Sequence, residues 1–176
     1  MAFADPARNI EVLELSPGMK VIDVGAGSGF YALLAARKVG ESGTVYAVDI
    51  QEGMLSRLKS EAARQRIHTI QTITADLEAE GSLPLSDAST DAAIISNTLF
   101  LIEKKDTAVE ETMRVLKPKS KILVIDWKDS YGGIGPPPSD VITTSKAIAL
   151  FAKHGARLLQ EFDAGDHHYG LLFQKT

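Results

Sequence analysis

Cysteine is missing from this 176-residue chain, and several kinds of chemistry are excluded with it. Disulfide bonds, thiolate metal sites and a thiol nucleophile all need a cysteine sulfur. The lack of cysteine does not determine the redox compartment of the protein, and nothing in the sequence requires export.

Basic residues are also too few to give the chain a positive charge. Lysine and arginine number 19 against 23 aspartates and glutamates, which gives a net charge of −4 and an isoelectric point near 5.6. That sign is wrong for collecting a polyanion over a broad surface. Nucleic acid is therefore not expected as a partner.

Long apolar runs are absent as well. The longest, residues 92–102, is interrupted by Ser96, Asn97 and Thr98 and is far shorter than the roughly 20 residues that span a membrane. The opening segment, MAFADPARNI, lacks the basic and apolar regions of a signal peptide. The sequence predicts a cytoplasmic protein without a membrane span.

Apolar residues make up 44% of the chain, enough for one core, so we expect residues 1–176 to form a single domain. Strand-like and helix-like segments alternate along it. Strands are predicted at residues 20–26, 44–50, 68–76, 91–97 and 121–127, and helices at 6–15, 30–39, 51–66, 104–117 and 139–155. This alternation favours an open, mostly parallel sheet with helices on both faces.

The last two apolar runs break that alternation. Residues 156–164 and 167–174 are separated only by a short turn near Gly165. Strands joined so closely pair antiparallel. The predicted fold is therefore α/β, with a mostly parallel sheet that ends in a C-terminal antiparallel hairpin.

Three glycines, Gly25, Gly27 and Gly29, follow the first predicted strand in the segment VIDVGAGSGFY. In open sheets of this class, ligands bind outside the carboxyl ends of the strands. Residues without a Cβ atom let the backbone approach a ligand closely, and amides at a helix N-terminus point toward it. A tight strand-to-helix turn without a ligand explains the same glycines.

Acidic residues end the next two strands at the same edge. Asp49 lies twenty residues after Gly29, where its carboxylate can accept both hydroxyl groups of a ribose. Its spacing to Glu52 also fits a capping box at the next helix. Asp76 ends the third strand, where an N-cap is again the alternative. The three strand ends together favour an adenosine-type ligand.

A diphosphate does not fit this glycine segment. The dinucleotide fingerprint prefers glycine or alanine where this chain has Phe30, and no lysine follows in the Walker pattern. An NAD-dependent oxidoreductase is therefore disfavoured, and the ligand is expected to carry no diphosphate.

Five segments occur in a fixed order: VIDVGAGSGFY, VYAVDI, ADLE, LPLSDASTDAAIISNTLF and RVLKPKSKILVIDW. They resemble the successive motifs of class I S-adenosylmethionine-dependent methyltransferases, of the small-molecule type that includes the ubiquinone and menaquinone biosynthesis enzymes. The resemblance covers residues 5–174. It implies a Rossmann-like sheet of seven strands with the last one inserted antiparallel, and transfer of a methyl group from S-adenosylmethionine to a small-molecule acceptor, with S-adenosylhomocysteine as product.

The same resemblance implies roles for residues at the strand ends. It places Asp23 and the glycines beside the methionine moiety and Asp49 on the ribose. It places Ile50 and Met54 along the adenine, Asp76 and Leu77 at the polar edge of that base, and Ser96 near the amino group. The expected cofactor-binding residues are Asp23, Gly25, Ala26, Gly27, Gly29, Tyr31, Asp49, Ile50, Met54, Asp76, Leu77 and Ser96.

Methyl transfer from a sulfonium needs positioning more than a catalytic triad, because the methyl group arrives activated. His167 and His168 are the candidates for a general base, but neighbouring strand residues point to opposite faces, so at most one faces the site. A surface or packing role explains either of them. Asp126 and Asp129 raise the alternative of metal assistance, but their loop is of a common kind and no metal is expected.

The sequence leaves the acceptor side open. The first strand begins at residue 20, so the N-terminal part is short, and the GPPP segment lacks the arginine that often follows it in related proteins. A cofactor-binding module without catalysis, or a subunit that needs a partner, is therefore an alternative, and a homodimer stays open as an assembly. Residues 131–138, YGGIGPPP, are predicted to form a wall or lid over the acceptor, with a plain linker as the alternative.

Overall fold

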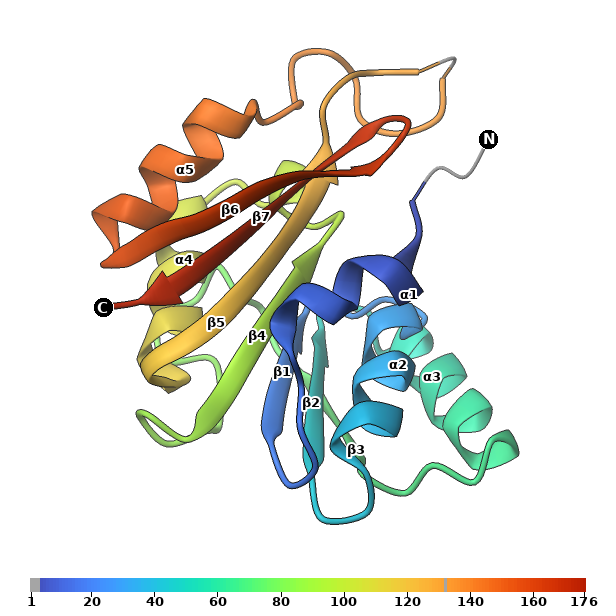
Figure 1. Cartoon of the computed structure of the whole chain (residues 1–176). Helices are drawn as coiled ribbons and strands as arrows, with labels where there is room; N and C mark the ends of the chain where they lie inside the picture. The colour runs from blue at the N-terminus through green and yellow to red at the C-terminus, as the bar shows by residue number, and fades with distance from the viewer. Residues whose placement is uncertain (1–3, 132) are drawn as a thin grey trace.

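Seven strands form one sheet in the computed structural model, which describes residues 4–131 and 133–176 (Figure 1). The strands are β1 (Lys20–Val24), β2 (Thr44–Asp49), β3 (Ile70–Thr74), β4 (Thr90–Ser96), β5 (Leu116–Trp127), β6 (Ala156–Gly165) and β7 (His168–Lys175). Their order is β3-β2-β1-β4-β5-β7-β6. Strand β7 pairs antiparallel with β5 and β6, and the other neighbours pair parallel, which confirms the predicted fold.

Helices cover both faces of the sheet. Neighbouring side chains of a strand point to opposite faces, so they enter two different hydrophobic cores. Val21 of β1 packs with apolar residues of η1, α2 and α3, whereas Ile22 packs with those of α4 and α5. The helices are α1 (Pro6–Asn9), α2 (Phe30–Val39), α3 (Glu52–Arg64), α4 (Lys105–Val115) and α5 (Thr144–Lys153), with 3-10 turns η1 (Ile10–Leu13) and η2 (Leu99–Leu101). Among the residues described, no helix has the length and apolarity that a membrane crossing requires.

Two predicted helices are shorter in the structure. The first, predicted at 6–15, begins at a confirmed N-cap, because the Asp5 carboxylate accepts from the Arg8 amide at 3.1 Å. It tightens into η1 and ends at Leu13. The helix predicted from residue 139 starts only at α5, where the Thr143 hydroxyl accepts from the Lys146 amide at 3.3 Å.

The boundary between α4 and β5 also differs from the prediction. Helix α4 ends at Val115, and β5 begins at once with Leu116, five residues before the predicted start at Lys121. Leu116 pairs with Thr90, and a register shift then separates this pair from the regular ladder. Positive φ at Lys119 accompanies this irregular stretch, which carries no apolar alternation in the sequence.

The carboxyl ends of β1, β2, β4 and β5 meet at one edge of the sheet. Strand β2 pairs on one side of β1 and β4 pairs on the other, so the strand order reverses at β1. A crevice is expected where the order reverses. His168, at the start of the antiparallel β7, reaches the same edge because it pairs with Trp127 at the end of β5.

The segment predicted as a lid leaves β5 at this edge. Tyr131 and Ile134 form an isolated antiparallel bridge, in which the Ile134 amide donates to the Tyr131 carbonyl at 2.7 Å. Gly135 lies against the indole of Trp127, where a Cβ atom would come within 2.7 Å of Cε3. Gly132 lies outside the described residues, so the lid stays a prediction.

Candidate functional site

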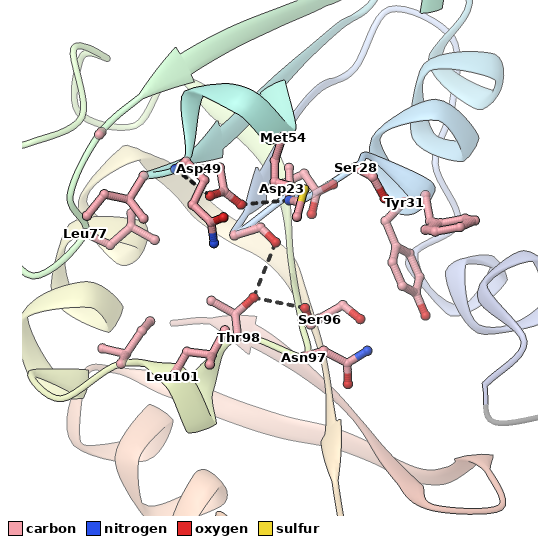
Figure 2. Close-up of a pocket in the computed structure, with 18 of the residues that line it drawn as sticks. Asp23, Ser28, Tyr31, Asp49, Met54, Leu77, Ser96, Asn97, Thr98 and Leu101 are labelled. Carbon is pink, nitrogen blue, oxygen red and sulfur yellow. Dashed lines mark hydrogen bonds between the residues drawn. The ribbon is translucent and has the colours of Figure 1, made fainter. Parts of the chain in front are cut away.

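A cavity of about 440 Å³ opens at the carboxyl ends of β1, β2 and β4 (Figure 2). This size is within the range of pockets that hold small molecules. All but one of the predicted cofactor-binding residues line it, namely Asp23, Gly25, Ala26, Gly27, Tyr31, Asp49, Ile50, Met54, Asp76, Leu77 and Ser96. The exception is Gly29.

The three glycines after β1 serve three different purposes. Their φ angles are 71°, 53° and 88°, so each has a backbone conformation that favours glycine. A Cβ atom on Gly25 would come within 2.3 Å of the Thr98 hydroxyl oxygen, whereas nothing lies within 4 Å of a Cβ atom on Gly27. Gly27 therefore leaves open space on the cavity side, and Gly25 makes room for Thr98.

Gly29 has a packing requirement of its own, and its role in cofactor binding stays a prediction. A Cβ atom on Gly29 would come within 2.2 Å of the Leu58 side chain, which belongs to α3. Leu58 is fully buried in the core between the helices and the sheet. Gly29 is thus needed for the close approach of α2 and α3, and it does not line the cavity.

Asp23 is a buried acid whose surroundings do not satisfy it. Its side chain is 2% exposed, and its Oδ2 atom has no hydrogen-bond partner among the described residues. Burial raises the pKa of Asp23 to about 7; the backbone amide of Ala32 opposes this shift and the charge of Asp49 adds to it. A buried carboxylate without a partner is unfavourable, so a cationic group of a ligand beside it would stabilise its charged form.

Asp49 joins the glycine segment to the turn before α3. Its Oδ2 accepts from the backbone N–H of Gly27 at 2.8 Å, and its Oδ1 accepts from the backbone N–H of Gln51 at 2.9 Å. The capping-box alternative is wrong, because the N-cap of α3 is Gln51 and no side chain caps it. Each carboxylate oxygen has a second lone pair, which leaves Asp49 able to accept further hydrogen bonds from a ligand.

The far side of the cavity is apolar with a polar edge. Ile50 is 61% exposed beside Met54, which gives the cavity an uncovered apolar surface. Leu77 is buried, and the Asp76 carboxylate accepts from the Glu78 amide at 2.9 Å. Asp76 therefore holds the turn that follows it, as its alternative interpretation predicted, and lines the cavity as well.

The end of β4 contributes two cavity residues, Asn97 and Thr98, that were not predicted to bind the cofactor. The Thr98 hydroxyl donates to the Ser96 carbonyl at 2.9 Å and fills the space beside Gly25. Asn97 lines the cavity with a positive φ of 53°, and its backbone N–H donates to the Ile125 carbonyl at 2.8 Å. The signal was the polar run Ser-Asn-Thr at the end of an apolar strand.

Neither histidine that was predicted as a base lines the cavity. The Nδ1 atom of His167 lies 2.8 Å from the Asp129 carboxylate, and its ring stacks on Tyr131 with 4.1 Å between the centroids. His168 is buried with its ring 4.3 Å from that of Trp127. Through these contacts, both histidines pack at the ends of β5 and β7.

Asp126 ties two segments together. It is 1% exposed and accepts from the Leu99 amide at 3.0 Å and from the Trp127 amide at 2.8 Å. Burial raises its pKa to about 6, against the lowering effect of these amides. Within residues 4–131 and 133–176, no group of three or more histidines and acids could hold a metal ion.

The charge of the cavity is one-sided. Four carboxylates line it, and none of its described lining residues is lysine, arginine or histidine. The acids are Asp23, Asp49, Asp76 and Glu78. Such a wall attracts cations and repels a diphosphate.

A protein family described as "Methyltransferase domain" matches residues 15–162. The chain belongs to this family. A ubiquinone/menaquinone biosynthesis C-methyltransferase from Laribacter hongkongensis is 31% identical over 153 residues, which cover 87% of this chain and 58% of that protein. An arsenite methyltransferase from Halobacterium salinarum is 30% identical over 127 residues, which cover 72% of this chain and 31% of that protein.

The architecture of this methyltransferase domain matches that of a solved structure over nearly its whole length. A SAM dependent methyltransferase from Aquifex aeolicus superposes with a TM-score of 0.89 at 28% identity, covering 99% of this chain and 91% of that one. By contrast, the chain spans less than two thirds of either curated relative.

Proposed function

We propose that this methyltransferase domain binds S-adenosylmethionine in the acidic cavity and transfers the methyl group to a small-molecule acceptor. The charge of the cavity carries the proposal. A ligand with sulfonium and ammonium groups suits four carboxylates without a basic partner, whereas the diphosphate of NAD does not.

Three features of the chain fit this cofactor. The unpartnered Oδ2 of Asp23 offers an acceptor for a cationic group. Asp49, whose oxygens are already oriented by two backbone amides, offers its remaining lone pairs to ribose hydroxyls. The open space beside Gly27 admits a ligand against the backbone.

Bound S-adenosylmethionine supplies a methyl group that is already activated for displacement. The contribution of the chain is then to position both reactants and to exclude water, which can supply much of the rate enhancement. Phe30 and Leu101, 72% and 66% exposed, stand at the cavity as apolar surface that bound reactants would cover.

The side chains of the cavity also limit the acceptor chemistry that we propose. No histidine lies among the described lining residues, and burial raises the pKa of Tyr31 to about 12. We therefore favour a nucleophile that needs no histidine base. Because the chain has a net charge of −4, we propose that the acceptor is a small molecule rather than a nucleic acid. We also propose that the reaction is cytoplasmic.

Calorimetry tests the binding step. S-adenosylmethionine and S-adenosylhomocysteine should each bind at one site per chain, and NADH should not bind. Binding of NADH together with failure of both other ligands would overturn the proposal. Binding without turnover on any acceptor would favour a cofactor-binding module or a subunit that needs a partner.

Two glycine variants locate the binding site. Gly27→Ala places a methyl group in the open space of the cavity and should weaken S-adenosylhomocysteine binding about tenfold or more, roughly 1.4 kcal/mol. Gly40→Ala is the matched control, because Gly40 has a similar positive φ of 63°, nothing within 4 Å of its Cβ position and no place in the cavity lining. Equal affinities in the two variants would place the cofactor elsewhere.

A further inference from the structure

A second groove adjoins the acidic cavity. Its volume is about 1000 Å³, and it lies between residues 100–107, which lead into α4, and residues 135–142, which lead into α5. Leu101 and Ile102 line both the groove and the cavity, so the two spaces share a wall. A molecule in the groove would therefore lie beside a ligand in the cavity.

Apolar and polar residues line the groove in about equal measure, and apolar side chains lie on both of its sides. Phe100 and Ile102 contribute on the side of α4, and Val141, Ile142 and Leu150 contribute on the side of α5. Apolar surface that is not covered by the chain itself favours binding of an apolar group.

Some charged side chains of the groove have hydrogen-bond or ion-pair partners, and others have none. Lys105 donates to the Ile102 carbonyl, and Asp106 is paired with Lys153 and with His154, at 2.6 Å and 2.8 Å. Asp140 accepts from the Ser139 hydroxyl at 2.9 Å.

Among the described lining residues, this leaves Lys104, Lys146 and Glu103 without a side-chain hydrogen bond or an ion pair. Lys105 and Asp140 bond neutral groups and keep their charges, whereas the charge of Asp106 is offset by Lys153. Three lysines are therefore set against Glu103 and Asp140, which leaves the groove with an excess of one positive charge. The cavity across the Leu101 wall has the opposite sign.

We propose that the groove binds the part of the methyl acceptor that is not methylated, and that this acceptor is a small molecule with an apolar body and one anionic group held by Lys104 and Lys146. The inference rests on the proposed function, because only a cofactor in the neighbouring cavity gives the groove a methyl donor. The four carboxylates of that cavity repel the anionic group and so orient it toward the lysines.

A matched pair of fluorescent probes tests the site. 8-Anilinonaphthalene-1-sulfonate has an apolar body with one anionic group, and N-phenyl-1-naphthylamine has the same body without it. Both are titrated against the full chain saturated with S-adenosylhomocysteine, so that the acidic cavity is filled. The sulfonate should bind at one site and more tightly than the neutral probe.

Three variants assign the binding to the groove. Lys104→Gln with Lys146→Gln should weaken the sulfonate about three- to tenfold and leave the neutral probe unchanged. Val141→Trp fills the groove and should weaken both probes. Arg57→Gln with Lys59→Gln removes two exposed cations from α3 and should change neither affinity.

The proposal is overturned if the lysine pair and the α3 control behave alike, if Val141→Trp leaves both probes bound as before, or if the neutral probe binds as tightly as the sulfonate. Displacement of the sulfonate by S-adenosylhomocysteine also overturns it, because the probe then occupies the acidic cavity. If the proposed function fails, calorimetry shows no binding of S-adenosylhomocysteine. The two probes can then be titrated without that ligand, and the same variants still test whether they bind in the groove.

Discussion

Asp23 is the residue whose proton should report cofactor binding. Burial raises its pKa to about 7, so at pH 6 most of the unliganded protein carries Asp23 protonated. A cationic ligand beside the unpartnered Oδ2 favours the ionised form and lowers this pKa. S-adenosylmethionine should therefore release close to one proton per site at pH 6 and almost none at pH 8.

Calorimetry in buffers of different ionisation enthalpy measures this proton release. Asp23→Asn removes the titrating group, so the dependence on buffer should disappear in that variant while the fold persists. Proton uptake at pH 6, or release that survives in Asp23→Asn, would contradict the placement of a cation beside Asp23.

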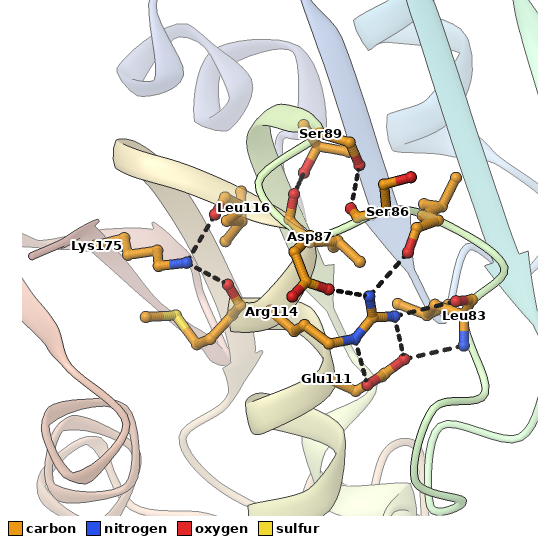
Figure 3. A network of polar contacts seen from close by, with 12 residues as sticks. Leu83, Ser86, Asp87, Ser89, Glu111, Arg114, Leu116 and Lys175 are labelled. Carbon is orange, nitrogen blue, oxygen red and sulfur yellow. Dashed lines mark hydrogen bonds and ion pairs between the residues drawn. The ribbon is translucent and has the colours of Figure 1, made fainter.

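Arg114 fastens the connection between β3 and β4 onto helix α4 (Figure 3). Its guanidinium donates to the Glu111 carboxylate at 2.6 Å and 3.0 Å and to Asp87 at 2.7 Å. It also donates to the carbonyls of Leu83 and Leu85, at 3.0 Å and 2.8 Å. Glu111 is 5% exposed and accepts from the Leu83 amide at 3.0 Å, so the cluster joins two elements through a buried charge.

Replacing this arginine should loosen both elements together. Arg114→Gln leaves the buried Glu111 without its cation and should lower the free energy of unfolding by about 2–4 kcal/mol in urea titrations. Arg157→Gln on β6 is the control, because that exposed arginine donates one hydrogen bond, to Gln174 at 3.1 Å, and its loss should change stability by less than about 0.5 kcal/mol. Similar values for the two variants would show that the cluster contributes little.

At the scale of elements, the sequence predicted what depends on local pattern and missed what depends on packing between segments. Apolar runs and turn residues gave the order of strands and helices and the C-terminal hairpin. The early start of β5 was missed because residues 117–120 show no strand period and pair only as the partner strand allows. The packing requirement of Gly29 was missed because it comes from Leu58, which is distant in the sequence.

For the whole molecule, the candidate site was predictable to the extent that parallel strands end at one edge. That rule and the family resemblance predicted that Asp23, Asp49 and Asp76 lie close together, and all three line the cavity. The groove beyond Leu101 was not predictable, because residues 100–107 and 135–142 meet only after the sheet and both helices have packed.

The pH at which the whole protein is most stable follows from the same buried acids. Asp23 and Asp126 have pKa values raised to about 7 and about 6, so the folded state binds their protons more tightly than the unfolded state does. Their contribution is full below pH 4 and is lost as the pH rises to 7, by up to about 1.4 kcal/mol per pH unit for each proton. The pKa of Glu111 is instead lowered by Arg114, so its contribution is lost as the pH falls.

Stability of the unliganded protein should therefore be greatest near pH 4 and should decline between pH 4 and pH 7, as measured by urea unfolding at each pH. Asp23→Asn should remove the larger part of that decline, and what is left belongs to Asp126. Saturating S-adenosylmethionine should also flatten the curve, because a cation beside Asp23 stabilises its ionised form. Stability that rises steadily from pH 5 to pH 8 would show that neither acid is protonated in the folded protein.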